Sequence, residues 1–101
     1  MIRNESGVKD HVKRILAKHG IFFFMPAANG YGTVGIADII AVFEGRFIAI
    51  ETKFGKNTMT ANQVRFKERV LAAGALHYLI DENDLEWFAK QMEQMCHDAD
   101  I

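Results

Sequence analysis

The chain has few of the residues that would place it in several large classes of protein. It contains one cysteine, Cys96, so no disulfide can form within it. It contains one proline, Pro26, and its longest apolar runs, 21–25 and 39–43, are far shorter than the ~20 residues that a membrane span needs. No signal peptide is evident in the first residues. We therefore expect an intracellular (cytoplasmic) protein that uses neither disulfides nor a membrane.

The remaining composition is that of an ordinary globular domain. Half of the residues are hydrophobic and a quarter are charged. No linker or repeat divides the sequence, which predicts a single domain over residues 1–101. The net charge of −1 conceals an asymmetry, because residues 1–80 carry eleven Lys or Arg against six Asp or Glu, whereas residues 81–101 carry one against seven. A basic body can attract phosphates locally, although a charged surface is most often simply solvated.

The central stretch of the sequence has the pattern of a β-hairpin. Two β-branched and aromatic runs, 36–43 and 46–53, are separated by a Glu-Gly pair at 44–45, which is typical of a two-residue turn. Such a turn fixes the register of the two strands. Extended to its end, the antiparallel ladder places Asp38 opposite Glu51.

Asp38, Glu51 and Lys53 are the candidate catalytic cluster. Opposed residues have Cβ atoms about 5 Å apart, and period two puts Lys53 on the same face and Thr52 on the other. Two carboxylates side by side repel one another, and Mg²⁺ (or Mn²⁺) relieves such repulsion while also binding water and phosphate. A solvated sheet edge is the alternative, but both strands are apolar on both faces, which predicts a hairpin covered on both sides. An odd-numbered turn without a bulge would separate the carboxylates.

The flanking segments predict the rest of an α/β fold with a mixed sheet. Helical spacing of apolar residues, caps and short β-branched runs give the order α-β-β-β-α-β-α. The predicted elements outside the hairpin are a helix over about 4–19 capped by Asn4, a buried strand over 21–25, a helix from Thr60 to about Ala73, a strand over 75–80 and a helix from near Asp84.

Several further residues are candidates for the site. Glu5 lies on the apolar stripe of the first helix, either because the helix dipole favours it there or because it belongs to the acidic cluster. Gln63 follows Thr60 in a capping-box pattern, and it also lies where it could contact metal-bound water. Candidate substrate contacts, with a plain turn as the alternative for the first three, are Asn29, Tyr31, Thr33 and Lys56. Side chains that could meet a phosphate backbone or only water are Lys9, Lys13, Arg14 and Lys18 on the first helix and Arg65, Lys67 and Arg69 on the second.

The order of these motifs resembles the PD-(D/E)xK nuclease superfamily and, in more detail, its virus-type replication-repair nuclease family, VRR-NUC. The similarity covers about residues 3–80. Ala37 stands where the superfamily pattern has proline, but only the carboxylate that follows is needed for the chemistry. The matching positions are Glu5, His19-Gly20, Gly35-x-x-Asp38, Glu51-Thr-Lys53, Thr60-x-x-Gln63 and Gly74.

The resemblance implies a restriction-endonuclease-like core and a role for each matching residue. Asp38, Glu51 and the backbone carbonyl of Thr52 would bind Mg²⁺ or Mn²⁺. Lys53 would position or activate water, while Glu5 and Gln63 would hold metal-bound waters.

The resemblance also implies a substrate and a partner. Stand-alone members of the family, often from phages and bacteria, are expected to form homodimers that cut branched DNA, as Holliday junction resolvases do. Three alternatives stay open at this point. They are a flap or restriction-type nuclease with the same site, a nuclease-like module that binds DNA without cutting it, and an acidic-tailed protein-interaction domain.

Overall fold

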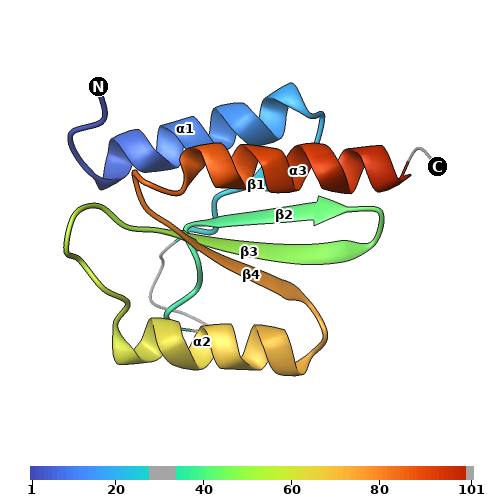
Figure 1. Cartoon of the computed structure of the whole chain (residues 1–101). Coiled ribbons are helices and arrows are strands. Elements are labelled where there is room, and N and C mark those ends of the chain that lie inside the picture. Colours follow the sequence, from blue (N-terminus) through green and yellow to red (C-terminus); the bar gives the residue numbers. More distant parts are fainter. Residues whose placement is uncertain (28–33, 100–101) are drawn as a thin grey trace.

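A computed structural model describes residues 1–27 and 34–99 of the chain. Within these ranges the elements follow the order α-β-β-β-α-β-α, which confirms the predicted order (Figure 1). They are α1 (Glu5–Lys18), β1 (Phe22–Phe24), β2 (Ile39–Phe43), β3 (Arg46–Thr52), α2 (Ala61–Ala72), β4 (Leu76–Ile80) and α3 (Leu85–Ala99).

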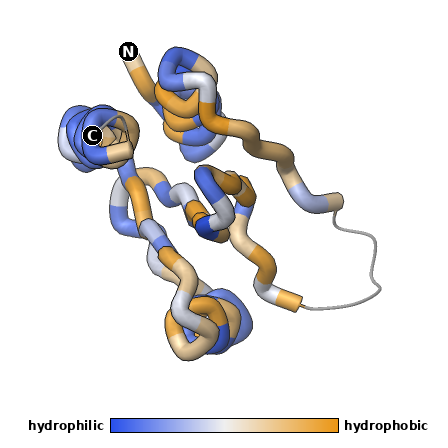
Figure 2. Tube along the Cα trace, turned by 90° about the vertical axis from the view of Figure 1, so that its right-hand side faces the viewer, coloured by the Kyte–Doolittle hydropathy of each residue, from blue (hydrophilic) through white to orange (hydrophobic). Residues whose placement is uncertain are grey.

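The four strands form one mixed sheet in the order β1-β2-β3-β4. The pairs β1–β2 and β2–β3 are antiparallel, and β3–β4 is parallel. Helices α1 and α3 lie side by side on one face of the sheet, and α2 lies on the other (Figures 1 and 2). No helix in the described ranges is long and apolar enough to cross a membrane.

The predicted hairpin register is confirmed. Glu44 and Gly45 both have positive φ angles, 49° and 80°, as a type I′ turn requires. The ladder runs from Phe43 opposite Arg46 to Ile39 opposite Ile50. The first strand is shorter than expected, because it begins at Ile39 and leaves residues 36–38 as the segment that leads into it.

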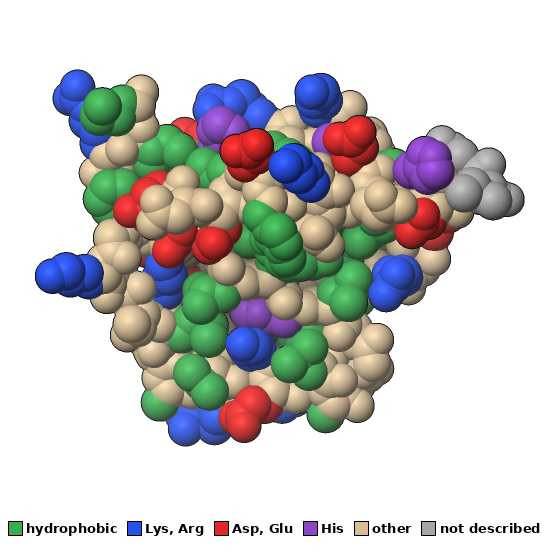
Figure 3. Space-filling view, in the orientation of Figure 1, with side chains coloured by type: hydrophobic (Ala, Val, Ile, Leu, Met, Phe, Trp, Pro, Cys, Tyr) green, Lys and Arg blue, Asp and Glu red, His purple; other side chains and the backbone are tan. Residues whose placement is uncertain are grey.

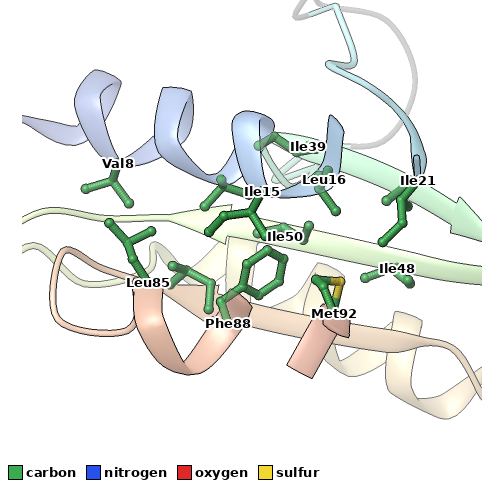
Figure 4. Close-up of a cluster of buried hydrophobic side chains, with 13 residues drawn as sticks. Val8, Ile15, Leu16, Ile21, Ile39, Ile48, Ile50, Leu85, Phe88 and Met92 are labelled. Atoms are coloured by element: carbon green, nitrogen blue, oxygen red, sulfur yellow. The ribbon is translucent and has the colours of Figure 1, made fainter. Parts of the chain in front are cut away.

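The main core lies between the sheet and the pair of helices α1 and α3 (Figure 4). The first helix begins where predicted, because the Asn4 side chain accepts a hydrogen bond from the Gly7 N–H (2.8 Å). Its apolar stripe then faces the sheet, as its helical spacing predicts. Fully buried members of this core include Val8, Val12 and Leu16 of α1, Ile39, Ile48 and Ile50 of the sheet, and Phe88 and Met92 of α3.

The opposite face of the sheet is only partly covered. Ile40 and Ala49 are buried there together with Val70 of α2. Further from Asp38 and Glu51, Val42 and Phe47 point to the same face and are 36% and 39% exposed. The expectation that both faces of the hairpin are covered is therefore wrong for this half, because α2 packs only over the other half.

The expectation of a buried first strand is also wrong. β1 pairs with β2 alone and forms an edge of the described sheet. Side chains alternate along a strand, so Phe23 packs against the core while Phe22 and Phe24 point to the opposite face. There they are 65% and 45% exposed. The apolar run predicted that Phe22 and Phe24 are buried, but they are exposed because α2 does not extend over them.

The start of α2 is held against the segment that leads to Asp38. The predicted capping box is present, with the Thr60 hydroxyl accepting from the Gln63 N–H and the Gln63 Oε1 accepting from the Thr60 N–H. Gly35 has a φ angle of 73°, and a Cβ atom there would overlap the backbone carbonyl of Asn62. Only glycine allows this close approach.

Candidate active site

The predicted cluster assembles where β2 begins and β3 ends. Glu51 is the last but one residue of β3 and is 1% exposed, and Lys53 follows directly after the strand. The Lys53 ammonium lies 3.4 Å from Glu51 Oε2. The Lys53 N–H also donates to the Ile80 carbonyl (3.0 Å), which extends the pairing with β4 and fixes the backbone of the lysine.

Asp38 is held against the end of β3 by Thr52. Asp38 Oδ2 accepts hydrogen bonds from the Thr52 N–H (3.0 Å) and from the Thr52 hydroxyl (2.7 Å). The alternation of side chains along the strand predicts that the Thr52 side chain lies apart from the cluster, on the other face of the sheet. That separation is wrong, because Asp38 lies just before β2 and its carboxylate bonds to the fully buried threonine.

Gln63 joins the capping box of α2 to the cluster. Its Nε2 donates to Glu51 Oε2 (2.8 Å), while its Oε1 accepts from the Thr60 N–H (2.9 Å). The predicted cap is thus present, and the same amide bonds directly to Glu51. Its contact with metal-bound water stays a prediction. The other carboxylate oxygen, Glu51 Oε1, is buried and has no hydrogen-bond partner among the described residues.

The surroundings of Glu51 favour its neutral form. Burial raises the pKa of this carboxyl from 4.5 to about 7, and the charge of Asp38 acts in the same direction. Lys53 opposes the shift through its charge and its hydrogen bond. Burial therefore outweighs the attraction of Lys53, and a cation bound between the two carboxylates would favour the ionised form.

Two charged residues of α1 lie near the cluster. Glu5, the first residue of the helix, is half-buried and contributes a small rise in the pKa of Glu51. Lys9, one helical turn later, places its ammonium 3.7 Å from Asp38 Oδ1. From the sequence, the partners expected for Lys9 were only a phosphate backbone or water. The signal that could have found it is its i,i+4 spacing from Glu5, which puts both residues on one side of the helix.

The remaining candidates are placed outside the cluster or are not described. Lys56 is exposed in the loop between β3 and α2. Gly55 in that loop donates its N–H to both carboxylate oxygens of Glu82 (3.0 and 3.1 Å), which anchors the loop to the segment after β4. Asn29, Tyr31 and Thr33 lie outside the described residues.

His77 is a half-buried titratable residue that the sequence did not single out for the site. It lies on β4 opposite Ala49, and its Nδ1 has no hydrogen-bond partner within the described ranges. Burial lowers its pKa from 6.5 to about 4, and the charge of Lys67 contributes. The imidazole is therefore neutral at pH 7.

The oxygen ligands of the cluster fit a divalent ion that has few protein ligands. Among residues 1–27 and 34–99, no three His, Cys, Asp or Glu side chains gather into a metal-binding group. Asp38 and Glu51 supply two carboxylates, and the resemblance adds the carbonyl of Thr52. Such a small set suits Mg²⁺, which keeps several waters and completes its shell with substrate phosphates. The buried, unpartnered Glu51 Oε1 also fits a cation.

The similarity to VRR-NUC nucleases rests on these residues and their order. Comparison of the sequence with protein-family models gave no match, and comparison with curated proteins gave none.

Proposed function

We propose that the protein is a metal-dependent endodeoxyribonuclease that hydrolyses phosphodiester bonds in branched DNA, with a restriction-endonuclease-like core. One observation carries this proposal. Asp38, Glu51 and Lys53 meet at one end of the sheet, where Glu51 is buried beside a second acid. Buried like charges are costly unless a partner compensates them, and function supplies a reason to keep them.

The two carboxylates, with the carbonyl of Thr52, are the groups that would hold Mg²⁺ or Mn²⁺. When bound, such an ion acts as a Lewis acid and lowers the pKa of a coordinated water. The ammonium of Lys53, fixed by its backbone bond to Ile80, remains to orient the attacking water and to stabilise negative charge on the phosphate.

Neighbouring side chains keep the two carboxylates in place. Thr52 fixes Asp38 through two hydrogen bonds, and Gln63 fixes Glu51 through one. Because Gln63 is also part of the α2 cap, the position of Glu51 depends on the folded start of that helix. A site built on rigid elements holds its geometry better than one built on loops.

The distribution of charge agrees with a DNA substrate. Acidic side chains lie along α3 and near its start (Figure 3), where the acidic C-terminal segment folds. Helices α1 and α2 carry seven of the basic residues, including Lys9 of α1, which pairs with Asp38. Local positive potential beside a nuclease site would attract the phosphate backbone.

A cleavage assay tests the proposal. We expect the protein to cut a four-way junction in Mg²⁺ or Mn²⁺ faster than a flap or a linear duplex, and EDTA to stop the reaction. Asp38→Asn and Glu51→Gln are each expected to lower the cleavage rate at least 100-fold, and Lys53→Met to slow turnover much more than it weakens DNA binding.

Lys90 offers a matched control. It is an exposed lysine of α3 that pairs with Glu86, so Lys90→Met is expected to leave cleavage unchanged. Binding of DNA without cleavage in either metal would replace the nuclease by a DNA-binding module. Cleavage by a folded Asp38→Asn protein would refute the site assignment, and equal cutting of all three substrates would refute the preference for branched DNA.

A further inference from the structure

Asp38 and Glu51 each have one carboxylate oxygen that neighbouring side chains hold in place and one that they do not. Asp38 Oδ2 accepts both hydrogen bonds from Thr52, at 2.7 and 3.0 Å. Glu51 Oε2 accepts from Gln63 Nε2 (2.8 Å) and lies 3.4 Å from the Lys53 ammonium. The two remaining oxygens, Asp38 Oδ1 and Glu51 Oε1, are therefore the ones that the cluster can offer to a cation.

The remaining oxygen of Asp38 faces a cation that comes from another element. Lys9 of α1 places its ammonium 3.7 Å from Oδ1, whereas Glu51 Oε1 has no hydrogen-bond partner among the described residues. The backbone of Lys9 is held beside the cluster because Val8 and Val12, on the same helix, are fully buried against the sheet. The ammonium at Asp38 thus results from the docking of α1.

The contact between Lys9 and Asp38 is an ion pair that can open. Its length of 3.7 Å exceeds the roughly 2.7–3.2 Å of a hydrogen bond. The Lys9 side chain is 34% exposed, and a lysine ammonium on its flexible stem is readily taken up by water. Partly exposed ion pairs of this kind contribute little to stability, so Lys9 can leave Asp38 without disturbing the fold.

We propose that Lys9 is a counter-ion of the metal site, which occupies Asp38 Oδ1 in the ion-free protein and must leave it when a divalent cation binds. Two cations beside one carboxylate oxygen repel one another, and the double charge of a divalent ion doubles the repulsion. Lys9 therefore lowers the affinity of the site for the ion. Lys53 differs from it, because its ammonium pairs with the oxygen of Glu51 that Gln63 already holds.

The inference rests on the metal site of the proposed function, but it does not depend on DNA cleavage. Lys13 provides a matched control on the same helix. It also pairs with an aspartate, Asp10, at 3.5 Å, and its side chain is 32% exposed. The two lysines thus differ chiefly in whether the paired carboxylate belongs to the cluster.

Calorimetric titration with Mn²⁺ tests the inference. We expect Lys9→Met and Lys9→Gln each to lower the dissociation constant for Mn²⁺ at least about 5-fold, because each removes a unit charge close to a divalent ion. Lys9→Arg keeps the charge and should not bind Mn²⁺ more tightly than the wild type. Lys13→Met should change the constant by less than about 2-fold, because its charge lies away from the cluster and is screened. Asp38→Asn should weaken binding at least about 10-fold, which assigns the measured ion to this site.

Each outcome decides the matter. A folded Lys9→Met protein that binds Mn²⁺ no more tightly than Lys13→Met overturns the inference, and so does a wild-type protein that binds no Mn²⁺ at millimolar concentration. If Lys9→Met does not fold, Lys9→Gln decides in its place.

Failure of the counter-ion and failure of the proposed function give different results. DNA cleavage by the wild type, together with unchanged Mn²⁺ affinity in Lys9→Met, would refute the counter-ion and leave the nuclease standing. Tighter Mn²⁺ binding by Lys9→Met in a chain that cuts no DNA would support the counter-ion and refute the nuclease.

Discussion

Glu51→Gln should make the metal-free protein more stable at neutral and alkaline pH. The folded protein raises the pKa of this carboxyl from 4.5 to about 7. A group whose pKa is raised on folding contributes stability that is fully present below pH 4.5 and is lost as the pH rises through 7. At about 1.4 kcal/mol for each tenfold change in a protonation equilibrium, the loss for the wild type is about 3 kcal/mol. The amide of the variant stays neutral and does not incur this loss.

The assay is urea unfolding in EDTA at a series of pH values between 4 and 8. The two proteins should have similar unfolding free energies near pH 4, and the variant should be about 3 kcal/mol more stable at pH 8. In a chain of this length that difference corresponds to a rise in melting temperature of more than ~10 °C. Addition of Mg²⁺ at pH 8 should raise the stability of the wild type and have little effect on the variant, because the ion binds only the ionised site of the folded state.

Glu68→Gln serves as the control for this measurement. Glu68 is an exposed residue of α2, and its neutralisation should change stability by less than ~0.5 kcal/mol at either end of the pH range. Unfolding free energies of the wild type and Glu51→Gln that run parallel from pH 4 to 8 would refute the view that Glu51 is held at an electrostatic cost.

The remaining predictions concern the supports of the fold and the site. Folding lowers the pKa of His77 from 6.5 to about 4. The wild type should therefore lose up to about 3 kcal/mol of stability as the pH falls from 6.5 to 4. Urea unfolding of His77→Leu should not show this loss. Gly35→Ala should destabilise by more than ~3 kcal/mol because its Cβ meets backbone, whereas Gly45→Ala, also at positive φ but in open space, should cost about 1 kcal/mol in thermal unfolding; equal losses would contradict the close approach. Gln63→Ala and Thr60→Ala should each cost about 1 kcal/mol as lost caps, but only Gln63→Ala should also slow DNA cleavage at least 10-fold. Equal cleavage by these two variants would show that the amide acts only as a cap.

Local patterns in the sequence were sufficient to predict the hairpin and the caps. A Glu-Gly pair between two β-branched runs is compatible with few types of β-turn. The observed positive φ angles at both positions set the register of β2 and β3. The Asn4 cap and the Thr60–Gln63 box are likewise satisfied within a few residues of chain. Such features are predictable because their hydrogen bonds close over short distances in the sequence.

The contacts of the candidate site were predictable only in part. Side chains two residues apart on a strand share a face, which predicted that Glu51 and Lys53 lie together. The structure confirms that their side chains pair. The hydrogen bonds from Thr52 to Asp38 were missed because they depend on where β2 begins. The strand begins only at Ile39, so Asp38 is free of the ladder and its carboxylate can turn to Thr52. The pairing of Lys9 with Asp38 was missed because it requires α1 to be docked on the sheet at a particular position.

The sequence by itself determined the order of the elements, the hairpin register and the pairing of Glu51 with Lys53 at its end, because each follows from spacing along the chain. Only the tertiary structure decided which apolar residues are buried. Phe22 and Phe24 read as core residues, yet they lie on the open part of a sheet face that a single helix covers incompletely. Hydropathy measures the tendency of a side chain to leave water, whereas its burial depends on which surface the rest of the fold brings against it.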